Sequence, residues 1–467
     1  MQVEQRWPDW GVNLAAIGLV FACGLAMWFA SGVAIAFGFA ALATLVIVAV
    51  PIAGFAAIAT ALPLVHNPVE LGGSAFTFLE LAIVSTSAGV LIAIVREGYA
   101  AEPSRWFKNE PVLWTWIGAA CLFGAGLQTI LMPIETAHLR EAVRQFRWVI
   151  VDAVAMFVIA RYVLRRYGIM PVIGILVLPA VVVSISATLM TIQGGSSFSA
   201  DGVSRAAGPY LHPNNLALYL ERIFVLCAGL SVAGLRRYRR LAGVAAGFLG
   251  AGLALTLSRG AIVGVAIGLA VIAWIARSRV IAFLSLAGMS TSVALFAIFA
   301  GDRLAGAESS GVGESRLALW RASIAMLRDY PVSGIGLDQF LYQHAPRYID
   351  PVFWSERYIS HPHNMLLDAW LSLGLAGLML LIAAVILLAR QARGLSTSGA
   401  VDSFWATAAI GALAAGAVHG LVDNSYFLPD LAALTWLLLA VATHTVCRSG
   451  ELPSTADRLR MSGKESL

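Results

Sequence analysis

The sequence has few charged residues and few cysteines. Only 12% of its 467 residues are charged and 59% are hydrophobic, whereas charged residues make up about 25% of a soluble domain. This composition excludes an ordinary soluble protein and predicts a polytopic membrane protein. The four cysteines lie within or beside apolar runs without metal-ligand spacing, so we interpret them as small core residues.

Several sequence motifs of soluble enzymes are also absent. The chain contains no P-loop, no GxGxxG after a strand, no HExxH and no cluster of carboxylates. A nucleotide-sugar enzyme that holds a metal ion with an acidic pair is therefore disfavoured.

The first apolar run lacks a small-residue cleavage site, which favours an uncleaved span with Trp7 and Trp10 as interfacial anchors.

The apolar runs predict an all-α fold of 12–14 transmembrane helices with one large outer loop. A spanning helix needs about 20 residues. The run at 52–65 is shorter, and we expect it to be re-entrant or fused with its neighbour. The candidate runs are 12–30, 33–50, 52–65, 75–95, 112–132, 148–164, 170–192, 213–235, 241–257, 260–276, 280–299, 363–389, 403–421 and 428–447.

The basic residues predict the topology. Twenty-nine of the 31 are Arg, and they cluster at the ends of apolar runs. Basic residues favour short cytoplasmic loops, and the clusters alternate with the spans, so all of them can lie on one side. The net charge of +5 is thus a topology signal and does not indicate nucleic-acid binding. The segments predicted outside are 66–74, 133–147, 193–212, 258–260, 300–362 and 422–427.

We predict three parts of the chain. They are an amino-terminal transmembrane bundle over residues 1–240, a membrane region over 241–447 and a cytoplasmic tail over 448–467. The middle part includes the outer, predicted periplasmic, loop at 300–362, whose first residues are flexible by composition.

An amphipathic helix is predicted within this loop. Leu317, Trp320, Ile324 and Leu327 recur at helical spacing, and Pro331 ends the pattern. The loop also holds many aromatic residues, which either stack on sugar rings or anchor the loop to the bilayer.

Four Arg residues are candidates for anion binding. Arg259 lies between two apolar runs with almost no loop, where it either binds a ligand or extends to lipid phosphates. Arg222 lies within an apolar run, and an intramembrane Arg is a functional hypothesis by default. Its neighbour Glu221 neutralises it poorly, because adjacent helix residues point apart. Arg316 and Arg321 lie off the apolar stripe of the predicted outer helix.

The segment Ser360-His361-Pro362-His363-Asn364 lies where the polar loop meets the next apolar run. A titratable group at a water–lipid boundary costs several kcal/mol when it is unsolvated and unpaired. The two histidines either cap and solvate the start of a helix or carry chemistry. An imidazole at this boundary suits a general base.

Taken in order, these motifs resemble those of the O-antigen ligase/polymerase superfamily of bacterial membrane glycosyltransferases. The matching pieces are an SRG segment at 258–260, an R-x-x-x-W at 316–320, a P-x-x-G-x-G at 331–336 followed by Phe340, an H-x-H-N at 361–364, a G-L-x-G-L at 374–378 and a late Asp at Asp423. The resemblance covers residues 241–447 well, and the amino-terminal half mainly in its hydropathy.

The resemblance implies an all-helical enzyme of the bacterial inner membrane, active at its periplasmic face without a metal or other cofactor. It would transfer a glycan from an undecaprenyl-diphosphate carrier. Arg259 and Arg316 would bind the donor diphosphate, with Arg222 and Arg321 as second choices. The general base would be His363, with His361 as the alternative, and the supporting residues would be Asn364, Asp423 and His212.

The acceptor stays open at this point. It is the lipid A-core sugar for a ligase, a growing glycan for a polymerase, or a protein serine. The lack of a soluble carboxy-terminal extension disfavours the last of these. A transporter or flippase is the alternative of another class, and such proteins favour broken helices and internal repeats near the midplane. The polar residues here gather at one face and no repeat is visible, which favours an enzyme.

Overall fold

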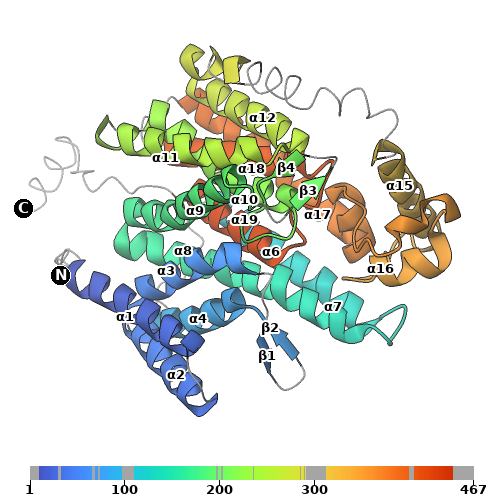
Figure 1. Cartoon of the computed structure of the whole chain (residues 1–467), viewed down its shortest axis with the longest axis horizontal. Helices are drawn as coiled ribbons and strands as arrows, with labels where there is room; N and C mark the ends of the chain where they lie inside the picture. Colours follow the sequence, from blue (N-terminus) through green and yellow to red (C-terminus); the bar gives the residue numbers. More distant parts are fainter. Residues whose placement is uncertain are drawn as a thin grey trace, which may run out of the picture.

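The computed structural model describes residues 10–29, 33–65, 69–71, 74–96, 110–195, 198–200, 203–234, 236–283, 286–288, 290, 312–398 and 404–444. Within this part the chain is almost entirely helical (Figure 1). The predicted all-α polytopic membrane fold is confirmed. The long helices are α1 (Trp10–Phe29), α2 (Val33–Ala49), α3 (Pro51–Ala61), α4 (Phe78–Arg96), α6 (Glu110–Leu131), α8 (Asp152–Tyr167), α9 (Ile169–Ile192), α10 (Pro213–Ala233), α11 (Arg236–Leu255), α12 (Arg259–Ala276), α15 (Val312–Asp329), α17 (Met365–Ser398), α18 (Phe404–His419) and α19 (Pro429–Ala442).

Shorter elements connect these helices. Two small antiparallel hairpins, which the sequence did not predict, pair Val69 with Phe76 and Phe198 with Arg205 at their ends. The short elements are the 3₁₀ turns Leu62–Leu64 and Pro351–Glu356, the π turns Arg147–Val151 and His344–Tyr348, the helices α7 (Leu139–Phe146) and α16 (Phe340–Gln343), and the strands β1 (Val69–Leu71), β2 (Ser74–Phe76), β3 (Phe198–Ala200) and β4 (Val203–Arg205).

Six of the described helices are long and apolar enough to cross a membrane. They are Phe78–Arg96, Pro111–Leu131, Ile169–Ile192, Pro213–Val232, Arg259–Ala276 and Met365–Thr397. Shorter apolar helices occupy most of the other described runs, and the short run at 52–65 follows α2 directly through Pro51 as the buried helix α3. The runs at 148–164 and 241–257 form α8 and α11, which belong to neither group. The predicted run at 280–299, the start of the outer loop and the tail 448–467 lie largely or wholly outside the described residues.

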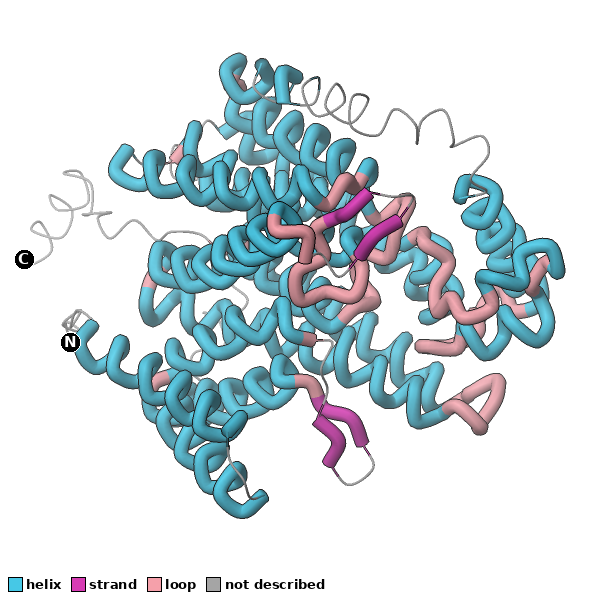
Figure 2. Tube along the Cα trace, in the orientation of Figure 1, coloured by secondary structure: helices cyan, strands magenta, loops and turns pink. Residues whose placement is uncertain are grey.

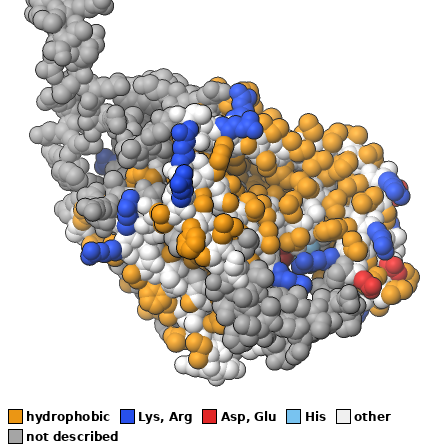
Figure 3. All heavy atoms as spheres, turned by 90° about the horizontal axis from the view of Figure 1, so that it is seen from above, with side chains coloured by type: hydrophobic (Ala, Val, Ile, Leu, Met, Phe, Trp, Pro, Cys, Tyr) orange, Lys and Arg blue, Asp and Glu red, His pale blue; other side chains and the backbone are white. Residues whose placement is uncertain are grey.

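The outer surface of the helices is apolar. Figure 3 shows one face covered by hydrophobic side chains, with Lys and Arg near its margins. Large apolar side chains such as Leu45, Leu131 and Ile192 are mostly exposed. Exposed apolar area on this scale is typical of a surface in contact with lipid. The composition and the exposed side chains therefore agree on a membrane protein.

The core is formed mainly by α8, α10, α18 and α19 together with α12. Glycines on α12 bring it close to α18, since a Cβ on Gly264 would lie 2.8 Å from the carbonyl oxygen of Ala415. A Cβ on Gly268 would lie 2.6 Å from the carbonyl oxygen of Gly411. Small residues allow such close approach between helices in a membrane, where burial of apolar surface drives little association.

Loops and hairpins gather toward one end of the helices (Figure 2). Arg144 forms an ion pair of 2.7 Å with Asp338, and Gln145 donates a hydrogen bond of 2.8 Å to the carbonyl oxygen of Phe427. These bonds join three of the segments that the charge pattern predicts on one side. Which side of the membrane this end faces stays a prediction.

α17 is interrupted at Gly374, whose φ is +67°. The loop after α15 fills the break. The amide of Ile335 donates to the carbonyl oxygen of Leu371 at 2.7 Å, and the amide of Leu375 donates to that of Val332 at 2.9 Å. Backbone groups freed by a helix break need partners inside a membrane protein. The loop supplies them.

The amphipathic helix α15 is present, but the predicted apolar stripe is partly wrong. Leu317 and Ile324 are about half exposed, whereas Leu319 and Met326 are buried with Leu327. Apolar residues lie on more than one face of α15, so their spacing alone does not identify the face that packs against the protein.

We expect Gly374→Ala to destabilise the protein by at least about 1–2 kcal/mol, the cost of a left-handed residue with a Cβ. Its Cβ would also lie 2.8 Å from the carbonyl oxygen of Ser333. The measurement is the thermal unfolding midpoint of purified protein in detergent. Gly394→Ala, on the same helix and with no atom near its Cβ, is the matched control and should be neutral or stabilising. Equal midpoints for the two variants would contradict the role given to Gly374.

Candidate active site

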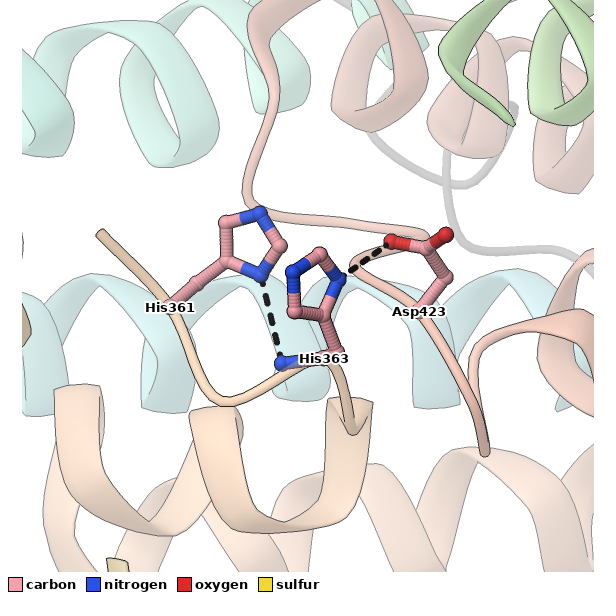
Figure 4. Close-up of side chains that lie close together, drawn as sticks. All are labelled: His361, His363 and Asp423. Atoms are coloured by element: carbon pink, nitrogen blue, oxygen red, sulfur yellow. Dashed lines mark hydrogen bonds and ion pairs between the residues drawn. The ribbon is translucent and has the colours of Figure 1, made fainter. Parts of the chain in front are cut away.

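The centre of the candidate site is a hydrogen bond between His363 and Asp423 (Figure 4). Nδ1 of His363 lies 3.0 Å from Oδ1 of Asp423, and the side chains are 23% and 4% exposed. The ring is thus partly accessible while the carboxylate behind it is buried. His363 adopts a left-handed conformation with φ of +51°, which is uncommon outside glycine but tolerated by His.

Asn364 positions His363 at the start of α17. Its Oδ1 accepts hydrogen bonds from the amides of Leu366 at 3.0 Å and Leu367 at 3.1 Å, so it caps the helix. Its amide nitrogen donates to the carbonyl oxygen of Leu421 at 3.1 Å. Asn364 therefore joins the His363 segment to the turn that carries Asp423.

Asp423 is held by three donors. Oδ1 accepts from His363 and from the amide of Asn424 at 2.8 Å, and Oδ2 accepts from the side-chain amide of Asn214 at 2.8 Å. Burial acts to raise the pKa of Asp423, but the hydrogen bond from His363 and the neighbouring His361 and His419 hold it well below its usual range. The carboxyl group is therefore ionised and accepts hydrogen bonds only.

His361 packs edge-on against His363, with ring centroids 4.2 Å apart. Its Nδ1 accepts a hydrogen bond of 3.3 Å from the backbone amide of His363. Burial lowers the pKa of His361 to about 3, and the neighbouring His363 and the guanidinium of Arg316 add to the effect. His361 is thus a neutral ring that supports the turn.

His212 lies at the amino end of α10 and caps it. Its Nδ1 accepts a hydrogen bond of 3.1 Å from the amide of Asn214. Burial lowers the pKa of His212, and the nearby Arg205 lowers it further. His212 is therefore also neutral near pH 7.

Arg316 is brought to the site by α15. One turn further along this helix, Nε1 of Trp320 donates a hydrogen bond of 3.1 Å to the carbonyl oxygen of Pro362, between the two histidines. The guanidinium of Arg316 is close enough to lower the pKa of both His361 and His212. It makes no hydrogen bond or ion pair with another described residue. Arg316 is therefore placed to meet an anion beside the histidines.

The other three Arg candidates lie in different surroundings. Arg259 is exposed at the first position of α12. Arg321 is exposed on α15, next to Trp320 in sequence and so directed elsewhere. Arg222 is buried at 2% exposure and donates to Thr435 Oγ1 and to the carbonyl oxygens of Leu431 and Ser425. The structure thus surrounds Arg222 with protein groups, and its role in donor binding stays a prediction.

Two residues of the site were missed from the sequence. Nε of Arg205 donates to the carbonyl oxygen of Thr256 at 2.8 Å, and its Nη2 donates to Oδ1 of Asn214 at 3.1 Å. Asn214 in turn holds Asp423. The available signal was that Arg205, His212 and Asn214 lie shortly before or at the start of an apolar helix.

The side chains of His361, His363 and Asp423 also have ligand types that suit a metal ion. Their candidate ligand atoms lie within 4.8 Å of one another. Both oxygens of Asp423 already accept hydrogen bonds from protein groups. The prediction of a metal-independent site stays a prediction.

A pH dependence of stability follows from His361. An unfolded imidazole titrates near about 6.5, whereas the pKa of the folded ring is about 3. Within this window only the unfolded chain binds the proton, so stability is lost as the pH falls below about 6.5. We expect the unfolding midpoint to drop more steeply between pH 7 and pH 5 in the wild type than in His361→Asn, which keeps an acceptor for the His363 amide. Parallel curves would contradict the assignment.

Comparison with known proteins gives one family. A family model described as O-Antigen ligase matches residues 242–382. The predicted resemblance is confirmed over this stretch, which contains Arg259, α15, the two histidines and the break in α17. No curated protein matches the chain. Asp423 and His419 lie outside the matched residues but contact His363 and Ser258 within them. Asn214 also lies outside and contacts Asp423.

Proposed function

We propose, from the membership of residues 242–382 in the O-antigen ligase family, that this chain is a membrane glycosyltransferase. It moves a glycan from an undecaprenyl-diphosphate carrier to an acceptor hydroxyl. The family supports activity of the ligase or polymerase type in general. The donor, acceptor and chemical steps given below are the proposal.

The hydrogen bond between His363 and Asp423 carries this proposal. An ionised carboxylate can only accept, so the His363 proton lies on Nδ1 and the lone pair on Nε2. Nε2 accepts the proton of the acceptor hydroxyl as that oxygen attacks the anomeric carbon. Asp423 stabilises the charged ring that results. Attack opposite the leaving group inverts the anomeric centre.

Arg316 and Arg259 are proposed to stabilise the departing diphosphate. Negative charge grows on the diphosphate as the glycosidic bond breaks, and fixed positive charge lowers the energy of that state. A planar guanidinium matches phosphate oxygens with two parallel hydrogen bonds. Arg316 lies beside the histidines, and Arg259 is exposed at a turn that is hydrogen bonded to Arg205. We propose no metal ion, because these residues supply the charge.

We place the enzyme in the bacterial inner membrane, as the family resemblance implies, with the site facing the periplasm, as the charge pattern of the loops predicts. An O-antigen ligase with lipid A-core as acceptor is the first choice, and a repeat-unit polymerase is the alternative. A transporter is disfavoured by one observation. The break in α17 is filled by the chain's own loop instead of facing a transport path.

Loss of the base should be the most severe defect. We expect His363→Ala to lower transfer by about 10²–10⁴-fold, the usual contribution of a general base. Asp423→Asn should approach this loss, because an amide can donate to Nδ1 and so stabilise the wrong tautomer. The measurement is the initial rate with purified protein, lipid-linked glycan and lipid A-core acceptor.

Asp338→Asn is the matched control for Asp423→Asn. It removes an acid from the same end of the molecule, where Asp338 pairs with Arg144 at 2.7 Å, and should retain most activity. Normal turnover by His363→Ala would refute the general-base assignment. Normal turnover combined with an inactive His361→Ala would move that role to His361.

The donor contact of Arg316 is tested by the donor KM. We expect Arg316→Ala to raise it by about 10–100-fold, as is typical for loss of a charged hydrogen-bonding partner. Arg316→Lys should recover only part of the donor affinity that Arg316→Ala loses, since an ammonium lacks the paired donors of a guanidinium. Arg328→Ala on the same helix, exposed at its last turn, is the control and should leave the donor KM unchanged. An unchanged KM in Arg316→Ala would remove Arg316 from the donor site.

A further inference from the structure

A second pair of histidine and carboxylate lies beneath the candidate site and has no role in the proposed mechanism. Nδ1 of His419, at the end of α18, lies 2.8 Å from Oε2 of Glu221 on α10, and the side chains are 1% and 0% exposed. The other carboxylate oxygen, Oε1, has no hydrogen-bond partner in the described part of the chain. A pair that served stability alone would be expected to satisfy both oxygens. Its incomplete bonding points to another role.

The pair reaches the start of α12 through Ser258. Nε2 of His419 lies 3.4 Å from Oγ of Ser258, which also accepts the amide of Ala261 and so caps α12. With the ring proton on Nδ1 toward Glu221, Nε2 accepts the hydroxyl proton of Ser258. Oγ keeps its lone pairs for the helix cap.

Glycine at position 260 makes this contact possible. A Cβ on Gly260 would lie 2.5 Å from Nε2 of His419, and one on Gly264 would lie 3.2 Å from Oε2 of Glu221. The ring therefore packs directly against the first turn of α12. Arg259 lies in that turn. It is preceded by Ser258, which contacts His419, and followed by Gly260, which leaves room for the ring because it has no Cβ.

The turn before α12 is held from its other side as well. The amide of Ala206 donates to the carbonyl oxygen of Leu255 at 2.9 Å, and Arg205 donates to that of Thr256 at 2.8 Å. Leu257, the next residue, has a left-handed φ of +50°, a conformation that a Leu adopts only when its surroundings impose it. The position of Arg259 thus depends on the contacts of the turn with Ala206 and Arg205 on one side and with His419 on the other.

We infer that Glu221, His419 and Ser258 form a relay of positioning residues that fixes the first turn of α12 and so sets where Arg259 meets the diphosphate of the donor. The inference rests on the proposed function, in which Arg259 binds that diphosphate. The three residues do not touch substrate. They act through Arg259.

The test is a set of steady-state measurements on the full-length protein with lipid-linked glycan and acceptor. Ser258→Ala removes the hydroxyl, and Glu221→Gln removes the charge while keeping the shape and leaving the cap of α12 intact. Each should raise the donor KM by about tenfold, the scale of one hydrogen bond to a charged group. The value of kcat and the acceptor KM should change less than about twofold, because the His363 base is untouched.

Double variants with Arg259→Ala distinguish an effect on the position of Arg259 from a general loss of packing. In an Arg259→Ala background, Ser258→Ala and Glu221→Gln should add no further increase in donor KM, since residues that act through one group are not additive. Ser184→Ala is the matched control. It also removes a buried serine hydroxyl, one that donates to the carbonyl oxygen of Phe248 on α11, and should leave the donor KM unchanged.

Three outcomes would overturn the inference. They are an unchanged donor KM in both variants, additive effects with Arg259→Ala, and loss of folding in both variants, which would make the pair a requirement of the fold alone. Failure of the proposed function gives a different result, because the wild type would then transfer no glycan from the lipid carrier to any acceptor.

Discussion

The buried carboxylate of Asp423 is the group on which the candidate site depends. It accepts hydrogen bonds from His363 at the start of α17, from Asn214 in the first turn of α10, and from the backbone of Asn424. A buried charge without such donors would cost several kcal/mol. The acid and its donors therefore require one another. Their mutual dependence brings together elements that lie about 200 residues apart in the sequence.

In the proposed function, binding a diphosphate and removing a proton make opposite demands on one site. The first needs positive charge, whereas the second needs a ring nitrogen with a free lone pair. Under this proposal, different residue types perform the two tasks. Arg316 supplies a guanidinium group, while burial lowers the pKa of His361 and His212 so that both remain neutral. The negative charge of Asp423 is placed behind His363, where it fixes the ring and offsets the nearby cations.

The sequence was sufficient to predict the helical membrane fold and the polar residues at the ends of apolar runs, because composition and hydropathy report both directly. It was also sufficient to single out His361, His363 and Asp423. The partners of these groups were not predictable. Asn214 with Asp423, and Glu221 with His419, are contacts between helices whose packing no local pattern specifies. The half-exposed Leu317 and Ile324 were placed on the wrong face of α15 for the same reason.

The path of the chain explains why glycine motifs and catalytic motifs occur together. The loop that fills the break at Gly374 follows α15, and α15 in turn holds Pro362 through Trp320. The His363 segment is thus confined between α15 and the start of α17, and both are fixed by one set of backbone hydrogen bonds. Glycines at 334 and 374 let two stretches of backbone meet, since both adopt positive φ. This contact connects the segment after α15 with the break in α17. Under the proposed function, the glycines contribute to the chemistry by geometry, at a distance from the reacting atoms.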